Sequence, residues 1–229
     1  EERTTNSETL EADTLAVLSD LNHASQKGLQ TIFDCSVGRS TVNHPLGGRY
    51  QLTPTEASVQ KLPVQHGVTH TASVMAQGFN PYIAEWSPYH GAAYAVIEAT
   101  ARLVATGANW SKARFSYQEY FERMDKQAER FGQPVAALLG SIEAQIQLGL
   151  PSIGGKDSMS GTFEELTVPP TLVAFGVTTA DSRNVLSPEF KAVGENIYYI
   201  PGQALSAEID FDLIKSNFAQ FEALQKAHK

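Results

Sequence analysis

The stretch from Ile153 to Gly161 holds the densest group of residues that could bind a phosphate. It reads Ile-Gly-Gly-Lys-Asp-Ser-Met-Ser-Gly. Paired glycines let successive backbone N–H groups turn toward one point and form an anion-binding nest. Lys156 adds a positive charge, Asp157 could hold a metal ion that bridges phosphates, and Ser158 adds a hydroxyl donor. The stretch is not a P-loop, because Gly155 stands where that motif requires lysine. Since Gly-Gly turns with nearby charges are common, a phosphate site and an ordinary turn both remain open.

Glu98 is the second candidate, because it lies in a predicted helix that is otherwise apolar or small on nearly every face. Such a helix is normally buried, and a carboxylate within it needs a partner. Arg102 stands one turn later, in the orientation that favours an ion pair. The residues alone favour an intrahelical Glu98–Arg102 ion pair. The functional alternative is that Glu98 is a metal ligand facing a nucleotide.

The remaining candidates carry little signal by themselves. Glu56 lies near the end of a predicted turn and Lys27 precedes a predicted strand, so each resembles an ordinary solvated charge. The histidines show no pair spacing typical of a zinc site. Cys35, the one cysteine, lies in a strand-like run, where a free cysteine is usually a small buried hydrophobe rather than a nucleophile.

Three helices are expected to position these residues. The first begins with Ser87 as N-cap and Pro88 at the first helical position, and it ends at Gly107. The second is predicted from the capping-box pattern Ser116-x-x-Glu119 and runs to Gly132. The third runs from Pro134 to Gly149.

Strands are expected on both sides of these helices, at 29–35, 58–64, 70–77 and 171–179, with a tight turn at Gly47-Gly48. A helical leucine stripe precedes them at Leu15, Leu18 and Leu21. After a glycine-rich loop and the strand at 171–179 come a polar linker, a strand at 197–200 and a final helix without a following sheet to cover it. This order predicts an α+β or α/β fold with a mixed sheet and flanking helices. The residues after 182 are predicted to open a second α/β domain.

Composition restricts the partners. The chain of 229 residues is 42% hydrophobic and 18% charged, with a net charge of −8. This charge argues against nucleic acid or an anionic membrane as the main partner, because both require a basic face. A single cysteine is typical of a reducing compartment, so we expect a cytoplasmic protein. The chain lacks an initiator methionine, and we expect it to be an internal piece of a longer protein.

Several of these stretches together resemble one family, the large single-chain form of phosphoribosylformylglycinamidine synthase. The resemblance extends from about residue 21 to residue 229. The stretches that carry it are Gly154-Gly155-Lys156-Asp157-Ser158-Met159-Ser160, Val168-Pro169-Pro170-Thr171-Leu172-Val173, Ala24-Ser25-Gln26-Lys27-Gly28-Leu29, Gln51-Leu52-Thr53-Pro54, Phe79-Asn80-Pro81-Tyr82 and Glu85-Trp86-Ser87-Pro88.

The resemblance implies a particular organisation. Two repeats related to aminoimidazole ribotide synthetase lie between an N-terminal region and a C-terminal glutaminase, and this chain resembles the second repeat. Residues 1–24 would be a lead-in, 25–182 the N-terminal domain of the repeat, and 183–229 a linker with the truncated start of its C-terminal domain. The expected partners are therefore the first repeat and the glutaminase of the same synthase. Because truncation leaves strand edges open, we also expect the piece to form a homodimer that mimics the missing repeat.

The family's reaction joins formylglycinamide ribonucleotide with glutamine-derived ammonia at the expense of ATP, giving the amidine, ADP and phosphate. Matching by motif assigns phosphate or nucleotide contacts to Lys27, Gly154, Gly155, Lys156 and Ser158. It assigns magnesium ligands to Glu56, Glu98 and Asp157, and it assigns no catalytic residue to this chain.

Two departures from the family pattern weaken the metal site. Arg102 stands where the pattern has asparagine, so a cation replaces a metal ligand, and Glu56 replaces an aspartate. The second repeat can hold an auxiliary nucleotide of structural character, so we expect the piece alone to be inactive. Two alternatives remain: a non-catalytic structural module with a degenerate pocket, and a free-standing relative of aminoimidazole ribotide synthetase or selenophosphate synthetase.

Overall fold

The computed structural model describes residues 7–21, 23–32 and 39–227. They belong to two compact units, which meet in the sequence between Cys35 and Ser36. The first unit contains helix α1 (Ser7–Ser19) and the short helix α2 (Lys27–Gln30). The helix predicted from the leucine stripe is confirmed, and it ends at Ser19.

The predicted strand at 29–35 is wrong at its start. Leu29 and Gln30 belong to α2, where the Gln30 N–H donates to the Gln26 carbonyl over 3.0 Å. Helical i→i−4 bonds of this kind satisfy the backbone locally, without a neighbouring strand. The rest of that prediction, including Cys35, lies outside the described residues.

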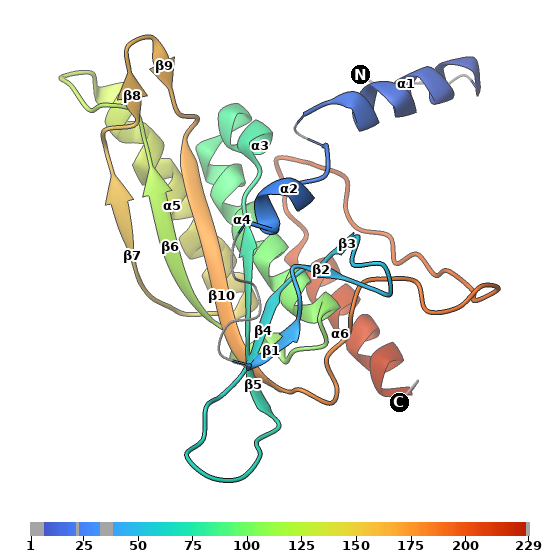
Figure 1. Ribbon diagram of the computed structural model, residues 1–229. Coiled ribbons are helices and arrows are strands. Elements are labelled where there is room, and N and C mark those ends of the chain that lie inside the picture. Colours follow the sequence, from blue (N-terminus) through green and yellow to red (C-terminus); the bar gives the residue numbers. More distant parts are fainter. Residues whose placement is uncertain (1–6, 22, 33–38, 228–229) are drawn as a thin grey trace. The chain divides into compact units, whose positions relative to one another are not determined.

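A six-stranded mixed sheet forms the centre of the second unit (Figure 1). The parallel pair β6–β7 lies at one edge, and all other neighbours are antiparallel. In spatial order its strands are β1 (Thr41–Asn43), β4 (Ser58–Lys61), β5 (Thr71–Gly78), β10 (Thr171–Asp181), β6 (Arg114–Tyr120) and β7 (Ser152–Ser158). Two small hairpins accompany the sheet: β2 (Leu46–Gly47) with β3 (Thr53–Pro54), and β8 (Thr162–Phe163) with β9 (Leu166–Thr167).

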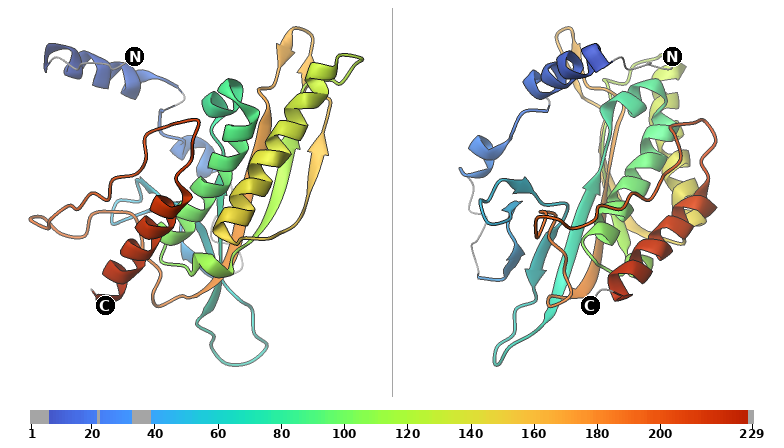
Figure 2. Two further views of the ribbon diagram at one scale, coloured as in Figure 1. Left: turned by 180° about the vertical axis from the view of Figure 1, so that it is seen from behind. Right: turned by 90° about the vertical axis from the view of Figure 1, so that its right-hand side faces the viewer.

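Helices cover one face of this sheet (Figure 2). Helices α3 (Pro81–Trp86) and α4 (Pro88–Ala105) follow β5, and α5 (Ala128–Leu148) lies beside α4. The core lies between the layers and includes Val74, Val96, Leu103, Phe115 and Leu172. Gly78 permits the close contact of α4 with β5, because a Cβ there would lie 2.1 Å from the Ala95 carbonyl oxygen.

The last helix, α6 (Phe211–Ala227), has a partner. It packs on α4 and α5 and buries Phe211 and Phe218. The Phe218 ring contacts Trp110 edge to face, with centroids 5.4 Å apart. The expectation that this helix lacks a covering layer is therefore wrong. Apolar residues on one helix face need a surface to bury them, and the outer side of α4 and α5 supplies it.

The predicted helix from Ser116 to Gly132 is also wrong. Residues 114–120 form β6, in which Phe115, Tyr117 and Glu119 are buried while Arg114 and Tyr120 are exposed. This period of two is that of a strand with one covered face. Helix α5 then begins at Ala128, six residues before the predicted start at Pro134, and it ends as predicted at Gly149 in the left-handed conformation, with φ 69°.

Two further predictions are corrected in the second half of the chain. The expected glycine-rich loop is the edge strand β7, because residues 152–158 pair with β6. No strand forms at 197–200 within the described residues, since a strand requires a neighbour to share its ladder. The mixed α/β fold class is confirmed. The segment after residue 182 lies in the same compact unit as the sheet, and the predicted domain boundaries stay predictions.

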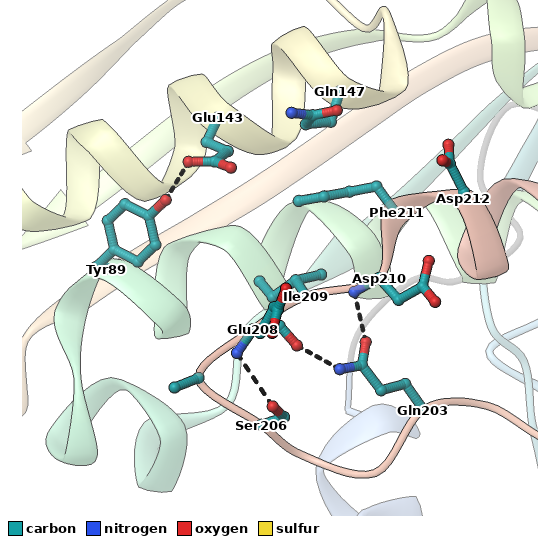
Figure 3. A pocket seen from close by; sticks show the side chains of 11 residues that line it. Tyr89, Glu143, Gln147, Gln203, Ser206, Glu208, Ile209, Asp210, Phe211 and Asp212 are labelled. Carbon is teal, nitrogen blue, oxygen red and sulfur yellow. Dashed lines mark hydrogen bonds between the residues drawn. The ribbon is translucent and has the colours of Figure 1, made fainter.

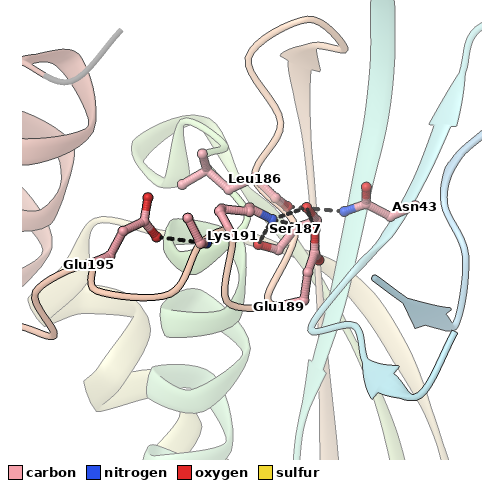
Figure 4. A network of polar contacts seen from close by, with 7 residues as sticks. Asn43, Leu186, Ser187, Glu189, Lys191 and Glu195 are labelled. Carbon is pink, nitrogen blue, oxygen red and sulfur yellow. Dashed lines mark hydrogen bonds and ion pairs between the residues drawn. The ribbon is translucent and has the colours of Figure 1, made fainter. Parts of the chain in front are cut away.

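A polar network fixes the start of this segment to the sheet (Figure 4). Asn43 Nδ2 donates to the Leu186 carbonyl over 3.1 Å. Lys191 Nζ lies 2.6 Å from Ser187 Oγ and 2.5 Å from Glu189 Oε1. The network therefore serves as an anchor.

Candidate functional site

Helix α4 presents Glu98 and Arg102 on one face. The helix begins as predicted, with the Ser87 side chain accepting from the His90 N–H and Pro88 in the first turn. Glu98 Oε1 accepts from Arg102 Nη2 at 2.7 Å. Its other oxygen, Oε2, accepts from the Phe79 N–H at 2.9 Å. Both oxygens of this carboxylate are thus engaged within the protein.

Glu56 reaches the same arginine from the loop before β4. Its Oε2 lies 3.5 Å from Arg102 Nε, so the guanidinium lies between two carboxylates contributed by segments far apart in the sequence. These are two of the three residues expected to bind magnesium. As they stand they do not fit that ion, because a guanidinium already occupies the position where a divalent cation would neutralise them. Among the described residues, no group of three or more His, Cys, Asp or Glu is arranged to hold a metal ion.

The glycine pair lies within β7 rather than in a nest. Gly154 has φ 146°, a conformation that side chains disfavour. A Cβ on Gly155 would lie 2.8 Å from the Tyr117 carbonyl oxygen, so this glycine allows β7 to approach β6. Side chains alternate along a strand, so Lys156 and Asp157 project from opposite faces. Lys156 and Ser158 share one face, and β7 is the edge strand of the sheet, with no further strand on its outer side within the described residues.

Strand register shows how far these groups lie apart. Gly78, Ala174, Tyr117 and Gly155 form one row across β5, β10, β6 and β7. Strands β5, β6 and β7 run in the same direction, so their carboxyl ends lie on the same side of the sheet. Glu98 is hydrogen-bonded to the backbone just after the end of β5. Asp157 lies on β7, and three strand spacings, about 14 Å, separate β7 from β5. The structure therefore joins Glu56 with Glu98 and leaves Asp157 apart.

Lys27 belongs to the other compact unit. It is the first residue of α2 in the first compact unit, whereas the other predicted site residues belong to the second. Its place in a nucleotide site stays a prediction.

Glu119 is a functional candidate that the sequence interpretation missed. It is buried on β6, with only 6% of its surface exposed, and it is the register partner of Asp157 on β7. Burial raises the pKa of Glu119 to about 7, and the Asp157 carboxylate adds to this rise. The buried Tyr117 hydroxyl, two residues earlier on the same face, has no hydrogen-bond partner among the described residues. The alternation of Phe115, Tyr117 and Glu119 was the signal that could have identified this strand.

A large open pocket lies elsewhere, between the start of α4, α5 and the segment before α6 (Figure 3). Its volume is about 670 Å³, and four carboxylates line it: Glu143, Glu208, Asp210 and Asp212. The Tyr89 hydroxyl donates to Glu143, and this bond raises the pKa of Tyr89 to about 12. None of the predicted site residues lines the pocket. Its acidity would repel phosphates, so it is not the predicted nucleotide site.

No helix in the described part of the chain combines the length and apolar character needed to span a membrane.

The comparisons identify the fold. No protein-family model matches the sequence, and no curated protein sequence matches it either. Solved structures do match. PurL from Thermotoga maritima complexed with ATP superposes with a TM-score of 0.63 at 17% identity, over 89% of this chain and 30% of that chain. PurLQS from the same organism gives 0.59 at 19% identity, over 72% of this chain and 25% of that one.

A third match is phosphoribosylformylglycinamidine synthase II from Thermotoga maritima, with a TM-score of 0.51 at 19% identity, over 66% of this chain and 23% of that chain. This chain therefore has the α/β fold of these structures, with its mixed sheet and flanking helices. It spans between about a quarter and a third of their length.

Proposed function

We propose that this chain is a module of a phosphoribosylformylglycinamidine synthase that supports the enzyme's structure and does not carry out turnover by itself. The shared fold supports the placement in this enzyme class, as do the motifs around Gly154–Ser160 and Ser87-Pro88. The observation that carries the structural role is the position of Arg102 between Glu56 and Glu98.

Arg102 competes with a metal ion for the Glu56 and Glu98 carboxylates. Magnesium in a nucleotide site is held by carboxylates together with phosphate oxygens, and it requires near-octahedral geometry at short distances. In this chain Arg102 lies 2.7 Å from Glu98, and Glu98 also accepts the Phe79 N–H. A divalent ion would have to displace a guanidinium that holds a permanent charge. A metal-dependent phosphoryl transfer at this position is therefore disfavoured.

Nucleotide binding without turnover is compatible with the rest of the arrangement. Lys156 and Ser158 share the open face of β7 near its carboxyl end, where ligands commonly bind in α/β sheets. We propose that ATP or ADP contacts these two residues and the backbone at Gly154 and Gly155. Asp157 projects from the opposite face of β7, beside Glu119, and is the proposed metal ligand of this strand.

The reaction would belong to the complete synthase. There formylglycinamide ribonucleotide, ATP and glutamine-derived ammonia give the amidine, ADP and phosphate. The proposed partners of this chain are the first repeat and the glutaminase of the same enzyme, and the proposed compartment is the cytoplasm.

Calorimetric titration with ATP and with ADP, each with and without magnesium, tests the proposal. Three proteins are compared: the native sequence, Arg102→Asn and the control Arg183→Asn. Arg183 forms an exposed ion pair with Asp181 at 2.5 Å, remote from the helix α4 carboxylates. The control therefore removes one positive charge, as Arg102→Asn does, without altering the surroundings of those carboxylates. We expect weak or metal-independent binding by the native chain and the control, and magnesium-dependent binding only in Arg102→Asn.

Two results would contradict the proposal. Magnesium-dependent binding by the native chain that disappears in Asp157→Ala would show a working metal site despite Arg102. Release of phosphate from ATP by the isolated chain, in the presence of ammonium and formylglycinamide ribonucleotide, would favour the alternative of a free-standing enzyme. If all three proteins are folded and none binds nucleotide, the module has a purely structural role.

A further inference from the structure

Helix α5 has an apolar stripe on its outer face, away from the sheet. The stripe consists of six exposed side chains: Phe131, Val135, Leu138, Leu139, Ile142 and Ile146. Their exposed fractions range from 42% at Leu138 to 73% at Ile146. Seen from behind, α5 lies on the outside of the helix layer (Figure 2). A monomeric protein rarely exposes so continuous an apolar surface without using it.

This stripe is separate from the face that holds α5 in the fold. The inner face buries Pro134, Ala137, Ser141, Ala144 and Leu148. An amphipathic helix at a protein surface normally turns charged or polar residues outward. Between Phe131 and Ile142 the outward positions of α5 carry no charge. Helix α5 is therefore apolar on two sides, and the part of the chain that the structure describes covers only the inner one.

The stripe has an internal symmetry that indicates what covers it. Leu138 and Leu139 lie on either side of its midpoint. Val135 and Ile142 are equally far from that midpoint, and so are Phe131 and Ile146. If a second α5 lies antiparallel across the first, each apolar residue meets an apolar residue of the partner. Such self-complementarity, in which residue i contacts j and j contacts i, is what a two-fold interface requires.

We propose that two copies of this chain associate through antiparallel contact of their α5 helices, centred between Leu138 and Leu139. The charged residues near the stripe are compatible with this register. In this register Glu129 and Glu143 are not opposite each other, so no two like charges meet. This dimer differs from the homodimer expected from open strand edges. Its contact lies on α5, and the edge strand β7 takes no part in it.

The size of the surface sets the expected strength. From Phe131 to Ile146 the stripe extends about 24 Å at a rise of ~1.5 Å per residue. Six half-exposed side chains from each copy bury on the order of 800 Å² in total, which is below the range of stable complexes. We therefore expect reversible dimerisation in the micromolar range.

Sedimentation velocity of the full 229-residue chain over a concentration series tests the proposal. The native chain should shift from monomer to dimer as concentration rises. Leu138→Glu should remain monomeric, because it places a charge near the two-fold axis. Val193→Glu is the control, since Val193 is fully exposed in the segment before α6. Circular dichroism of all three proteins verifies that a monomeric result does not arise from unfolding.

A cross-linking experiment tests the register in a Cys35→Ser background with the double variant Val135→Cys and Ile142→Cys. This variant should form covalent dimers on mild oxidation, because the thiol introduced at position 135 lies opposite the thiol introduced at position 142 of the second copy. Either single variant should cross-link much less. These two positions are about 10 Å apart along one helix, too far for an intrachain disulfide.

The proposal fails if the native chain remains monomeric at several hundred micromolar. It also fails if Leu138→Glu still dimerises while Ile153→Lys, at the exposed edge strand β7, does not. Equal cross-linking of the single and double variants would overturn the antiparallel register.

Discussion

Gly140 of α5 lies against the backbone of Tyr89 in α4 so closely that a Cβ at residue 140 would be 1.9 Å from the Tyr89 carbonyl oxygen. No side chain can occupy that position without separating the two helices. This contact holds α5 beside α4, and α4 in turn carries Glu98 and Arg102.

Substitution Gly140→Ala should therefore destabilise the protein, by roughly 1–3 kcal/mol, as overpacking of a close contact does. The matched control is Gly132→Ala in the same helix, where an added Cβ has no atom within 4 Å. The control should stabilise the helix by up to about 1 kcal/mol, because alanine has the higher helix propensity. Urea denaturation of the two variants measures both effects, and a destabilised control or an unaffected Gly140→Ala would contradict the prediction.

Glu119→Gln should alter how stability depends on pH. The folded-state pKa of Glu119 is raised to about 7 from an ordinary value of 4.5. Below about pH 4.5 this group is protonated in both folded and unfolded chains, so it carries no penalty. As pH rises toward 7 the unfolded chain loses its proton first, and the native state loses stability relative to it.

The glutamine variant lacks this penalty. It should be more stable than the native protein at pH 8, by about 3 kcal/mol, and similar to it at pH 4.5. Urea midpoints at the two pH values provide the measurement. Asp157→Asn should give a smaller change of the same sign, because the Asp157 carboxylate is the lesser cause of the shift. If the stability difference between the native protein and Glu119→Gln did not change with pH, the raised pKa of the buried Glu119 carboxyl would be contradicted.

Arg102→Met should destabilise the native fold by about 1 kcal/mol at low ionic strength. It leaves the carboxylates of Glu56 and Glu98 near each other without a cation. The effect is small because all three side chains are partly exposed to solvent. It should shrink at high salt, where screening weakens the repulsion. Arg183→Met, at a more exposed pair, serves as the control and should change stability by less.

Phe218→Ala should lower the free energy of unfolding by roughly 3 kcal/mol, since it empties a buried aromatic position. Phe218 is only 7% exposed and contacts Trp110, whereas Phe190 is 84% exposed. Phe190→Ala should consequently have little effect. Equal effects of the two substitutions would mean that α6 is not docked on the helix layer in solution.

Local sequence determined the elements whose signals are complete within a few residues. Ser87 and Pro88 supply both the cap and the first turn of α4, so its start could be read without any distant contact. Gly149 ends α5 because it adopts the left-handed conformation that glycine tolerates. The Glu98–Arg102 ion pair follows from i,i+4 spacing on one helix. The alternating pattern of β10 likewise identified a strand with one covered face.

Tertiary structure decided the elements that depend on neighbours distant in the chain. Ser116 and Glu119 satisfy a capping box, yet they lie in β6 because β10 on one side and β7 on the other complete its hydrogen bonds. The glycine pair at 154–155 is a strand for the same reason. Glu56 reaches Arg102 only after β4 and β5 bring their segments together, and α6 finds its cover only once α4 and α5 are packed. Backbone hydrogen bonds of a helix close within one segment, whereas those of a sheet close between segments, and this difference separates what could be predicted from what could not.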